Sequence, residues 1–279
     1  MALVHTLLFF IRSDHYPEDM LQAEQCLSSL SRSNYKNVVL CNQGCISNAD
    51  LLRLVGKYDL NCTVLGDGTN MGIVEGRQAC FEYVWRKFPE ARYISELHLD
   101  MIFSTGWEST LLEYLNHNDE PMISCGIIDK AGLCTGLSEK AHTLPQEAAE
   151  WDRFLKSLQR DLIIPGFTHP CIHALKVLKA VGGYDTKFMK GPQCYEDDSL
   201  LLSYYYYYGT RRDWRPQINY NSVVYHGTAV QRLGLGDGIR NYLGLIQQYG
   251  IMGQKHLSEL HANPWQKKFF RQQYDLLHK

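Results

Sequence analysis

The stretch Leu3-Val4-His5-Thr6-Leu7-Leu8-Phe9-Phe10-Ile11 stands near the N-terminus and is apolar at almost every position. Such continuous hydrophobicity is typical of strands in parallel sheets that helices cover on both faces. Pro17, Glu18 and Asp19 then predict the start of a helix, because proline fits the first turn and acids suit the positive end of the dipole. The alternation of strand and helix continues to Ile127, so the sequence predicts an α/β protein with a doubly wound sheet.

Hydrophobic periodicity and turn residues place the other elements. Further strands are expected at Asn37–Leu40, Asn61–Leu65, Arg92–Leu99, Pro121–Ile127 and Asn219–Tyr225. Further helices are expected at Asp50–Leu60, Met71–Phe88, Trp107–Leu115, Glu147–Arg160, His173–Val181 and Tyr195–Tyr208. The segments Asp129–Pro145 and Gly182–Cys194 read as loops. We expect a single domain over residues 1–232 and a glycine-rich loop with a helical tail over residues 233–279.

The composition excludes several classes of protein. The 279 residues carry 28 basic and 30 acidic side chains, and a net charge of -2 excludes a globally basic nucleic-acid binder. The nine cysteines have no paired spacing, which favours reduced thiols over a disulfide framework. No apolar stretch approaches the roughly 20 residues of a membrane helix. We therefore expect a soluble, cytoplasmic protein, at most peripheral at the inner face of the membrane.

His98, Leu99 and Asp100 end the fourth predicted strand. Alternate residues of a strand share a face, so the side chains of His98 and Asp100 point the same way. Ligands of doubly wound sheets bind at the carboxyl edge, where a carboxylate could hold a divalent cation against a diphosphate. An Asp at the end of a strand can instead cap the next helix, and these residues alone leave both interpretations open.

Three consecutive acids, Glu196, Asp197 and Asp198, stand at the N-terminus of a predicted helix. Compensation of the helix dipole explains one or two of them without any function. One of these acids could instead act as a general base, because a catalytic carboxylate must be held by a rigid element near the cation site. His226 follows the last predicted strand, where an imidazole could bind a metal or be an ordinary buried side chain.

Four segments, taken in order, resemble the family 2 glycosyltransferases of the GT-A fold, which transfer a sugar from a nucleotide donor with inversion. They are Asn70-Met71-Gly72 with Gly76-Arg77-Gln78, then Tyr93–Asp100, then Leu178–Asp185 with Tyr195–Asp198, and finally Val224-Tyr225-His226. They are similar to the family's Asn-Gly turn with its "ARN" helix, its "fLDaD" strand, its "GGFDE…ED" segment and its "vyH" ending. The resemblance spans about Val4 to Ala229 and implies a Rossmann-like, doubly wound mixed sheet of the GT-A type.

The resemblance implies a role for each matching residue. Asp100 and His226 would bind a divalent cation, Mn²⁺ or Mg²⁺, which neutralises the leaving diphosphate. Asp197 would be the general base that deprotonates the acceptor hydroxyl, with Glu196 and Asp198 as rivals. The donor would be a nucleotide-diphosphate sugar, contacted by Arg12, Asn42, Asn70, Gly72, Arg77, His98 and Asp100. The acceptor would be a saccharide, a lipid-linked molecule or a peptide.

The sequence departs from the family pattern in ways that keep other functions open. His98 replaces the first Asp of the DxD motif, and Ser199 replaces the second acid of "EDxD". Arg12-Ser13-Asp14 and Cys41-Asn42-Gln43-Gly44 replace the segments that normally meet the base and ribose, so the base is not predicted. One alternative is a catalytically inactive, carbohydrate-binding relative. A sugar-phosphate nucleotidyltransferase is a weaker one, because no GxGxR-type loop follows the first strand.

Aromatic side chains are abundant, and two groups of them allow two interpretations each. Tyr204–Tyr208 is a run of five tyrosines, of which one or two could line an acceptor pocket while the others pack. Trp107 and Trp214 are candidates for stacking on a sugar. Packing is the favoured interpretation of the tyrosine run.

The last part of the chain combines a glycine-rich loop with a basic, aromatic tail. Gly234–Gly238 could form a lid over the donor, with Arg232 or Arg240 reaching phosphate, or a plain connector. The tail from Trp265 to Lys279 could lie on an anionic membrane. Docking on the core, or on a second subunit of a homodimer, is the favoured alternative.

Overall fold

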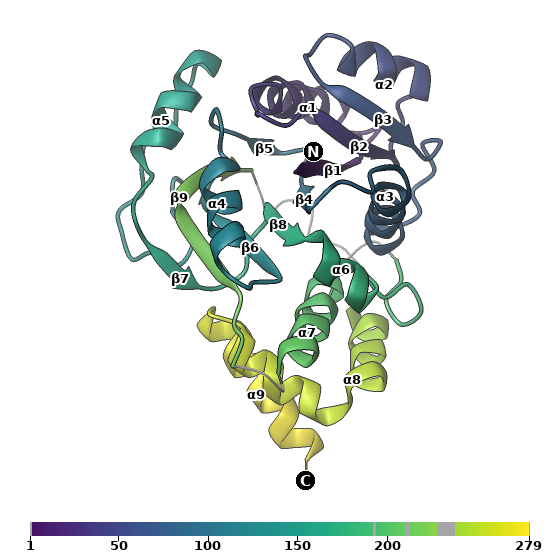
Figure 1. Ribbon diagram of the computed structural model, residues 1–279, viewed down its shortest axis with the longest axis vertical. Coiled ribbons are helices and arrows are strands. Elements are labelled where there is room, and N and C mark those ends of the chain that lie inside the picture. The colour runs from purple at the N-terminus through teal and green to yellow at the C-terminus, as the bar shows by residue number, and fades with distance from the viewer. Residues whose placement is uncertain (1, 192–193, 210–212, 228–237, 279) are drawn as a thin grey trace.

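The computed structural model describes residues 2–191, 194–209, 213–227 and 238–278 (Figure 1). Within these ranges the centre is a nine-stranded sheet in the order β3-β2-β1-β4-β8-β6-β9-β5, and β7 pairs with β9. The strands are β1 (Leu3–Phe9), β2 (Asn37–Asn42), β3 (Asn61–Leu65), β4 (Tyr93–Leu97), β5 (Met101–Ile102), β6 (Met122–Asp129), β7 (Ile163–Pro165), β8 (Cys171–Ala174) and β9 (Gln217–His226). The helices are α1 (Tyr16–Leu30), α2 (Asn48–Val55), α3 (Ile73–Lys87), α4 (Ser109–His117), the 3₁₀ turn Ala148–Glu150, α5 (Trp151–Ser157), α6 (Leu175–Val181), α7 (Glu196–Tyr208), α8 (Gly238–Leu260) and α9 (Pro264–Leu277).

The two halves of the sheet differ in strand direction. β1, β2, β3 and β4 run parallel, as the alternation with α1, α2 and α3 predicts. β8 is antiparallel to both β4 and β6, while β6 runs parallel to β9. β5 and β7 are antiparallel to β9. The predicted doubly wound, mixed α/β architecture is therefore confirmed.

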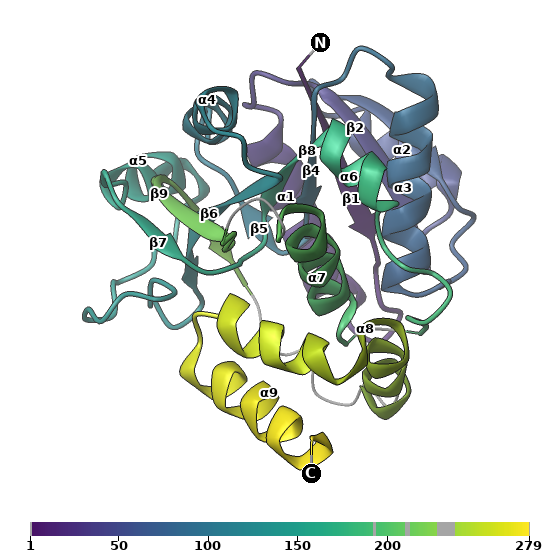
Figure 2. The same cartoon turned by 60° about the horizontal axis from the view of Figure 1, so that its bottom comes forward.

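Helices cover both faces of the sheet, and the alternation within β1 shows how. Leu3 and Leu7 belong to a buried cluster with residues of α1, α2 and α4. Val4 belongs to a second cluster, which contains residues of α3, α6, α7, α8 and α9, and Leu8 packs against it. Figure 2 shows α8 and α9 as a helical layer beside α7. A near-continuous apolar strand is thus explained by burial on both sides.

Short elements were predicted less well than long ones. Cys171–Ala174 is strand β8, so the predicted helix from His173 is wrong in its first two residues, and α6 begins at Leu175. The two-residue β5 and the three-residue β7 were not predicted. Short apolar runs carry too few residues for their period to separate strand from helix.

The aromatic candidates are mostly core residues. Tyr204 and Tyr208 are buried, which confirms packing for these two, while Tyr206 is exposed. Trp107 and Trp214 are 1% and 2% exposed, so the stacking of either ring on a sugar is wrong. Trp107 packs on Phe103 in the buried cluster that contains Leu3 and Leu7. Trp214 donates a hydrogen bond from Nε1 to the carboxylate of Glu120, which lies just before β6.

The helical tail shares its packing with the rest of the chain. Leu257, Leu260 and Phe270 belong to the same buried cluster as Phe81 of α3 and Tyr204 of α7. Docking on the core is therefore confirmed for this part of α8 and α9. None of the described helices is long and apolar enough to cross a membrane. A peripheral membrane contact, a homodimer and the domain boundary stay predictions.

The predicted lid falls largely outside the described residues. These exclude 228–237, and with them Arg232, the boundary at residue 232 and nearly all of Gly234–Gly238. Gly238 and Arg240 lie in the first turns of α8. The lid hypothesis therefore stays a prediction.

Candidate functional site

The two histidines and the aspartate of the predicted cation site lie together. β5 follows Asp100 directly and pairs with β9, so that Met101 is opposite His226. This register brings His226 Nε2 to 3.3 Å from Asp100 Oδ1 and to 3.1 Å from His98 Nδ1. One ligand atom from each of the three residues lies within 4.8 Å of the other two. The strand pairing thus joins residues that are far apart in the sequence into one candidate metal site.

Arg77 fixes the proton of His98. A guanidinium nitrogen, Nη2, lies 2.6 Å from His98 Nε2. Because a guanidinium has donors only, His98 Nε2 accepts this hydrogen bond, and the proton of the neutral ring must sit on Nδ1. Burial of the ring away from water, followed by the charges of His169 and Arg77, holds the pKa of His98 well below its ordinary value. His98 therefore presents an N–H to His226, and Nδ1 is not a free metal ligand.

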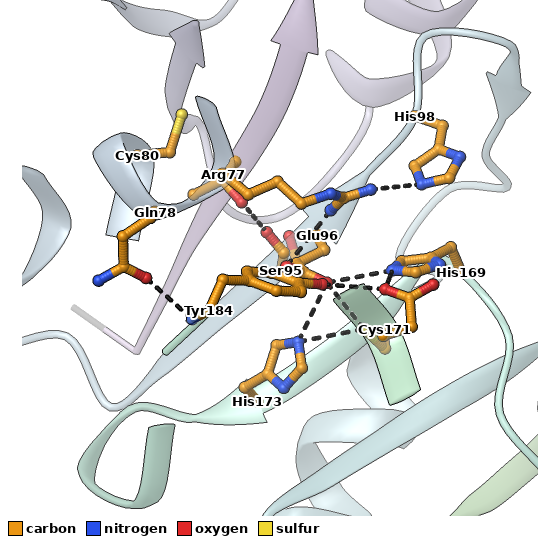
Figure 3. A network of polar contacts seen from close by, with 12 residues as sticks. Arg77, Gln78, Cys80, Ser95, Glu96, His98, His169, Cys171, His173 and Tyr184 are labelled. Carbon is orange, nitrogen blue, oxygen red and sulfur yellow. Dashed lines mark hydrogen bonds and ion pairs between the residues drawn. The ribbon is translucent and has the colours of Figure 1, made fainter. Parts of the chain in front are cut away.

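Glu96 is the centre of a buried polar network (Figure 3). Its side chain is 0% exposed and lies 3.3 Å from Nη1 of Arg77, which is 4% exposed. The other carboxylate oxygen lies 3.1 Å from His169 Nε2, 3.0 Å from the Tyr184 hydroxyl and 3.5 Å from His173 Nε2. Burial alone would raise the pKa of Glu96, but the charge of Arg77 and the hydrogen bonds from the two histidines outweigh it. Glu96 is therefore a permanent carboxylate inside the protein.

Asp197 lies at the other end of this network. Its Oδ1 is 3.1 Å from the Tyr184 hydroxyl and 3.7 Å from His169 Nε2. The Asp197 side chain is 29% exposed, so it also reaches solvent. The His169 ring stacks on His98 at a centroid distance of 4.6 Å. The predicted base and the predicted cation site are therefore neighbours, with Glu96, His169 and Arg77 between them.

The two rival acids are already bound inside the protein. Glu196 is 3% exposed and accepts a hydrogen bond from the backbone of Cys194 at 2.6 Å. Burial, followed by the charge of Asp197, raises the pKa of Glu196 to about 8. Asp198 lies 2.6 Å from His261 Nε2 of the segment after α8. Of the three consecutive acids, Asp197 is thus the one that combines exposure with the polar network.

Two of the other predicted donor residues lie at the carboxyl ends of parallel strands: Asn42 is the last residue of β2, and Arg12 follows β1. Arg12 is held by Asp19 through two side-chain hydrogen bonds, of 2.9 and 2.7 Å. Asn42 is fully buried and donates to the Ile46 carbonyl at 2.9 Å.

Two further predicted donor residues lie in the turn before α3. Asn70 accepts from the backbone N–H of Gly72 at 2.9 Å. Gly72 has φ +94°, and a Cβ there would lie 2.5 Å from the Gly191 carbonyl, so only glycine fits this approach of two loops. Donor binding by Arg12, Asn42, Asn70 and Gly72 stays a prediction.

A cavity adjoins the candidate cation site. Its volume is about 310 Å³, and Asp100 forms part of its wall. The remaining lining residues come from α1 and from the β5–β9 pair: Glu18, Leu21, Gln22, Gln25, Met101, Ile102 and Tyr225. Its size is at the lower end of the range for small-molecule sites. Asp100 thus faces a space that can hold part of a ligand.

Several residues of the network were not predicted from the sequence as site residues. Glu96 carries the clearest signal, because an acid inside the apolar strand Tyr93–Leu97 needs a buried partner. His169 and His261 stand in loops and give no local signal. Tyr184 was matched only as part of a motif, without a role.

The comparisons with known proteins bear on the fold. No protein-family model matches the sequence, and no curated protein is significantly similar to it. Residues 1–349 of S. aureus TarS superpose with a TM-score of 0.58 at 11% identity, covering 98% of this chain and 70% of that one. The same fragment in complex with UDP-GlcNAc gives 0.58 at 13% identity, covering 93% and 71%. GalNAc-T7 with UDP, GalNAc and Mn²⁺ gives 0.61 at 12% identity, covering 99% and 54%. At these identities the likeness establishes the GT-A fold alone.

Proposed function

We propose that this chain is a metal-dependent, inverting glycosyltransferase that transfers a sugar from a nucleoside-diphosphate donor to an acceptor hydroxyl. The observation that carries the proposal is the arrangement of the site. A partly exposed carboxylate, Asp197, and a candidate cation site, Asp100 with His226, lie at two ends of one buried polar network. The GT-A fold, shared with proteins whose structures hold UDP-GlcNAc or UDP with Mn²⁺, supports the donor class.

Asp100 and His226 are proposed to hold the cation. Their facing atoms are 3.3 Å apart, and a carboxylate oxygen with an imidazole nitrogen is a donor set that suits Mn²⁺ better than Mg²⁺. When bound, the cation would neutralise charge that develops on the leaving diphosphate. Asp100 also borders the 310 Å³ cavity, which we propose takes part of the nucleotide sugar.

His98 is proposed to bind the donor as a hydrogen-bond donor rather than as a metal ligand. Arg77 holds the His98 proton on Nδ1, which points at His226 Nε2. A cation held by His226 Nε2 would occupy the lone pair that otherwise accepts a hydrogen bond from His98. The His98 N–H would then bind a phosphate oxygen. Arg77, at 4% exposure, would thus act on the donor through His98 and not by direct contact.

Asp197 is proposed to be the general base. It would take the proton of the acceptor hydroxyl, whose oxygen forms the new bond to the anomeric carbon. The bond from that carbon to the diphosphate oxygen breaks on the opposite face, and its electron pair leaves with the diphosphate. Inversion follows from attack on the face opposite the leaving group. A positioned base of this kind contributes about 10²–10⁴-fold to the rate.

The test is a binding and turnover screen of nucleoside-diphosphate sugars with Mn²⁺, read by thermal shift and by release of the nucleoside diphosphate. A bound donor raises the melting temperature because it binds the native state. Asp100→Ala should abolish the Mn²⁺-dependent shift. Asp197→Asn should keep donor binding and lower turnover at least 100-fold. Asp275→Asn, at an exposed position of α9, is the matched control and should change neither.

Three outcomes would overturn the proposal in different ways. A fully active Asp197→Asn variant refutes the base assignment. Binding of donors without any turnover, by the wild-type chain and with acceptors of all three predicted kinds, indicates the inactive carbohydrate-binding alternative. Absence of any donor-dependent shift refutes the proposed function altogether.

A further inference from the structure

We infer that Tyr184 is a positioning residue for Asp197: its hydroxyl donates to Asp197 Oδ1 and so directs the other carboxylate oxygen to the acceptor. This inference rests on the proposed role of Asp197 as the base. Tyr184 stands 13 residues before Asp197 and is 3% exposed. It is a buried side chain with a single polar atom, and that atom lies between two carboxylates.

The assignment of the hydroxyl proton follows from counting donors. The Tyr184 oxygen lies 3.0 Å from Glu96 Oε2 and 3.1 Å from Asp197 Oδ1, but the hydroxyl has one proton to give. Burial, followed by the charges of Glu96 and Asp197, raises the pKa of Tyr184 well above its ordinary value, so the proton stays on the phenol.

His169 decides between the two acceptors. Its Nε2 lies 3.1 Å from Glu96 Oε2 and 3.7 Å from Asp197 Oδ1, so its proton belongs to Glu96. Glu96 also has the charge of Arg77 at 3.3 Å. Among the described residues, Tyr184 is the remaining side chain within hydrogen-bond distance of the Asp197 carboxylate. The arrangement that satisfies both carboxylates therefore pairs His169 with Glu96 and Tyr184 with Asp197.

Tyr184 is itself held rigidly, which is what a positioning residue requires. Its backbone N–H donates to Gln78 Oε1 of α3 at 2.9 Å. Its ring stacks on Phe81, one turn further along α3, with 5.7 Å between centroids and 16° between planes. A hydroxyl fixed from α3 thus limits the rotation of a carboxylate on α7. Without it, the base would be present but would spend less time oriented toward the acceptor.

The experiment is a double-mutant cycle that needs no substrate. Urea unfolding is measured for the wild type, Tyr184→Phe, Asp197→Ala and the double variant. Tyr184→Phe removes one oxygen and keeps the stacked ring, and Asp197 is partly exposed, so both variants are expected to fold. We expect the two effects to be coupled by about tenfold in the unfolding constant, which is about 1.4 kcal/mol. Tyr208→Phe is the matched control, since Tyr208 is buried on the same helix and its hydroxyl donates to Asp119 at 3.3 Å. Its cycle with Asp197→Ala should be additive.

Turnover distinguishes a positioning role from a merely structural one, because a structural role alone would not change kcat. With a donor found in the screen above, Tyr184→Phe should lower kcat about tenfold and leave the donor KM within twofold, and Tyr208→Phe should leave both unchanged. Coupling below twofold in the cycle overturns the inference, with or without turnover. An unchanged kcat in Tyr184→Phe also overturns it. If no donor is turned over, the proposed function fails, while the cycle still decides whether Tyr184 binds Asp197.

Discussion

Replacement of Glu96 by glutamine tests the centre of the network. The substitution keeps the shape of the side chain and removes its charge. Arg77 would then be a cation at 4% exposure without the carboxylate 3.3 Å away. Loss of one partner of a buried ion pair typically costs about 3–5 kcal/mol, because the other charge stays buried. Against a typical free energy of unfolding of about 5–15 kcal/mol, such a loss is readily measured by urea unfolding.

The control is the same chemical change on the surface. Glu24 lies 3.1 Å from Lys57, and the two side chains are 41% and 60% exposed. Glu24→Gln should cost less than about 1 kcal/mol. The double variant of Arg77→Met with Glu96→Gln should be less destabilised than the sum of the single variants, because no buried charge is left unpaired. A cost for Glu96→Gln within 1 kcal/mol of that for Glu24→Gln would refute the reasoning.

Three further predictions concern Glu196, Gly72 and His261. The pKa of Glu196 is raised from 4.5 to about 8, so between these values the native state binds more protons than the unfolded chain, and stability falls as pH rises. Glu196 lowers the free energy of unfolding by at most about 1.4 kcal/mol for each pH unit in this range. Urea unfolding at pH 5.5 and 7.5 should show this decrease in the wild type and not in Glu196→Gln. Gly72→Ala should destabilise more than Gly182→Ala in thermal unfolding, because both have positive φ but only the Cβ at position 72 meets a backbone atom, the Gly191 carbonyl at 2.5 Å; equal melting temperatures would contradict the clash. His261→Ala removes a contact of 2.6 Å to Asp198 and a ring stacked on Phe270, and should cost about 1.5–3 kcal/mol, whereas His15→Ala, at 43% exposure, should be near neutral in the same urea assay.

The parallel half of the fold is predictable because each of its strands and helices is long enough to show a period. Leu3–Phe9 and the elements to Lys87 follow the predicted order, with ends that shift by a few residues. In the other half of the sheet, the long strands β6 and β9 were predicted, but β5, β7 and β8 have only two to four residues, and their partners decide their structure. A four-residue strand such as Cys171–Ala174 is fixed by β4 and β6 on either side of it, and no local pattern carries that information.

The candidate site, like the fold, was predictable only in part. The motif residues could be found from the sequence because they lie next to the ends of strands and helices. Asp197 is in the first turn of α7, whereas Asp100 does not end a strand as predicted: β4 stops at Leu97, and His98–Asp100 form the turn before β5. Their environment could not be found, because it comes from distant segments: His169 meets Glu96 across 73 positions, and His261 meets Asp198 across 63. The contact of Arg77 with His98 likewise joins two separate elements, α3 and the turn after β4, and no local pattern predicts it. Donor binding by Arg77 stays a prediction.

The position of Arg77 between Glu96 and His98 has a consequence for how such a site can change over time. The Arg77 guanidinium orients His98, beside the candidate cation site, and also neutralises Glu96, whose partners Tyr184 and His169 lie beside Asp197. Under the proposed function, a substitution of Arg77 that adapts one side to a new sugar also alters the charge on which the other side depends. We expect strong epistasis between the two sides, so that a change of donor and a change of acceptor are acquired together or in a fixed order.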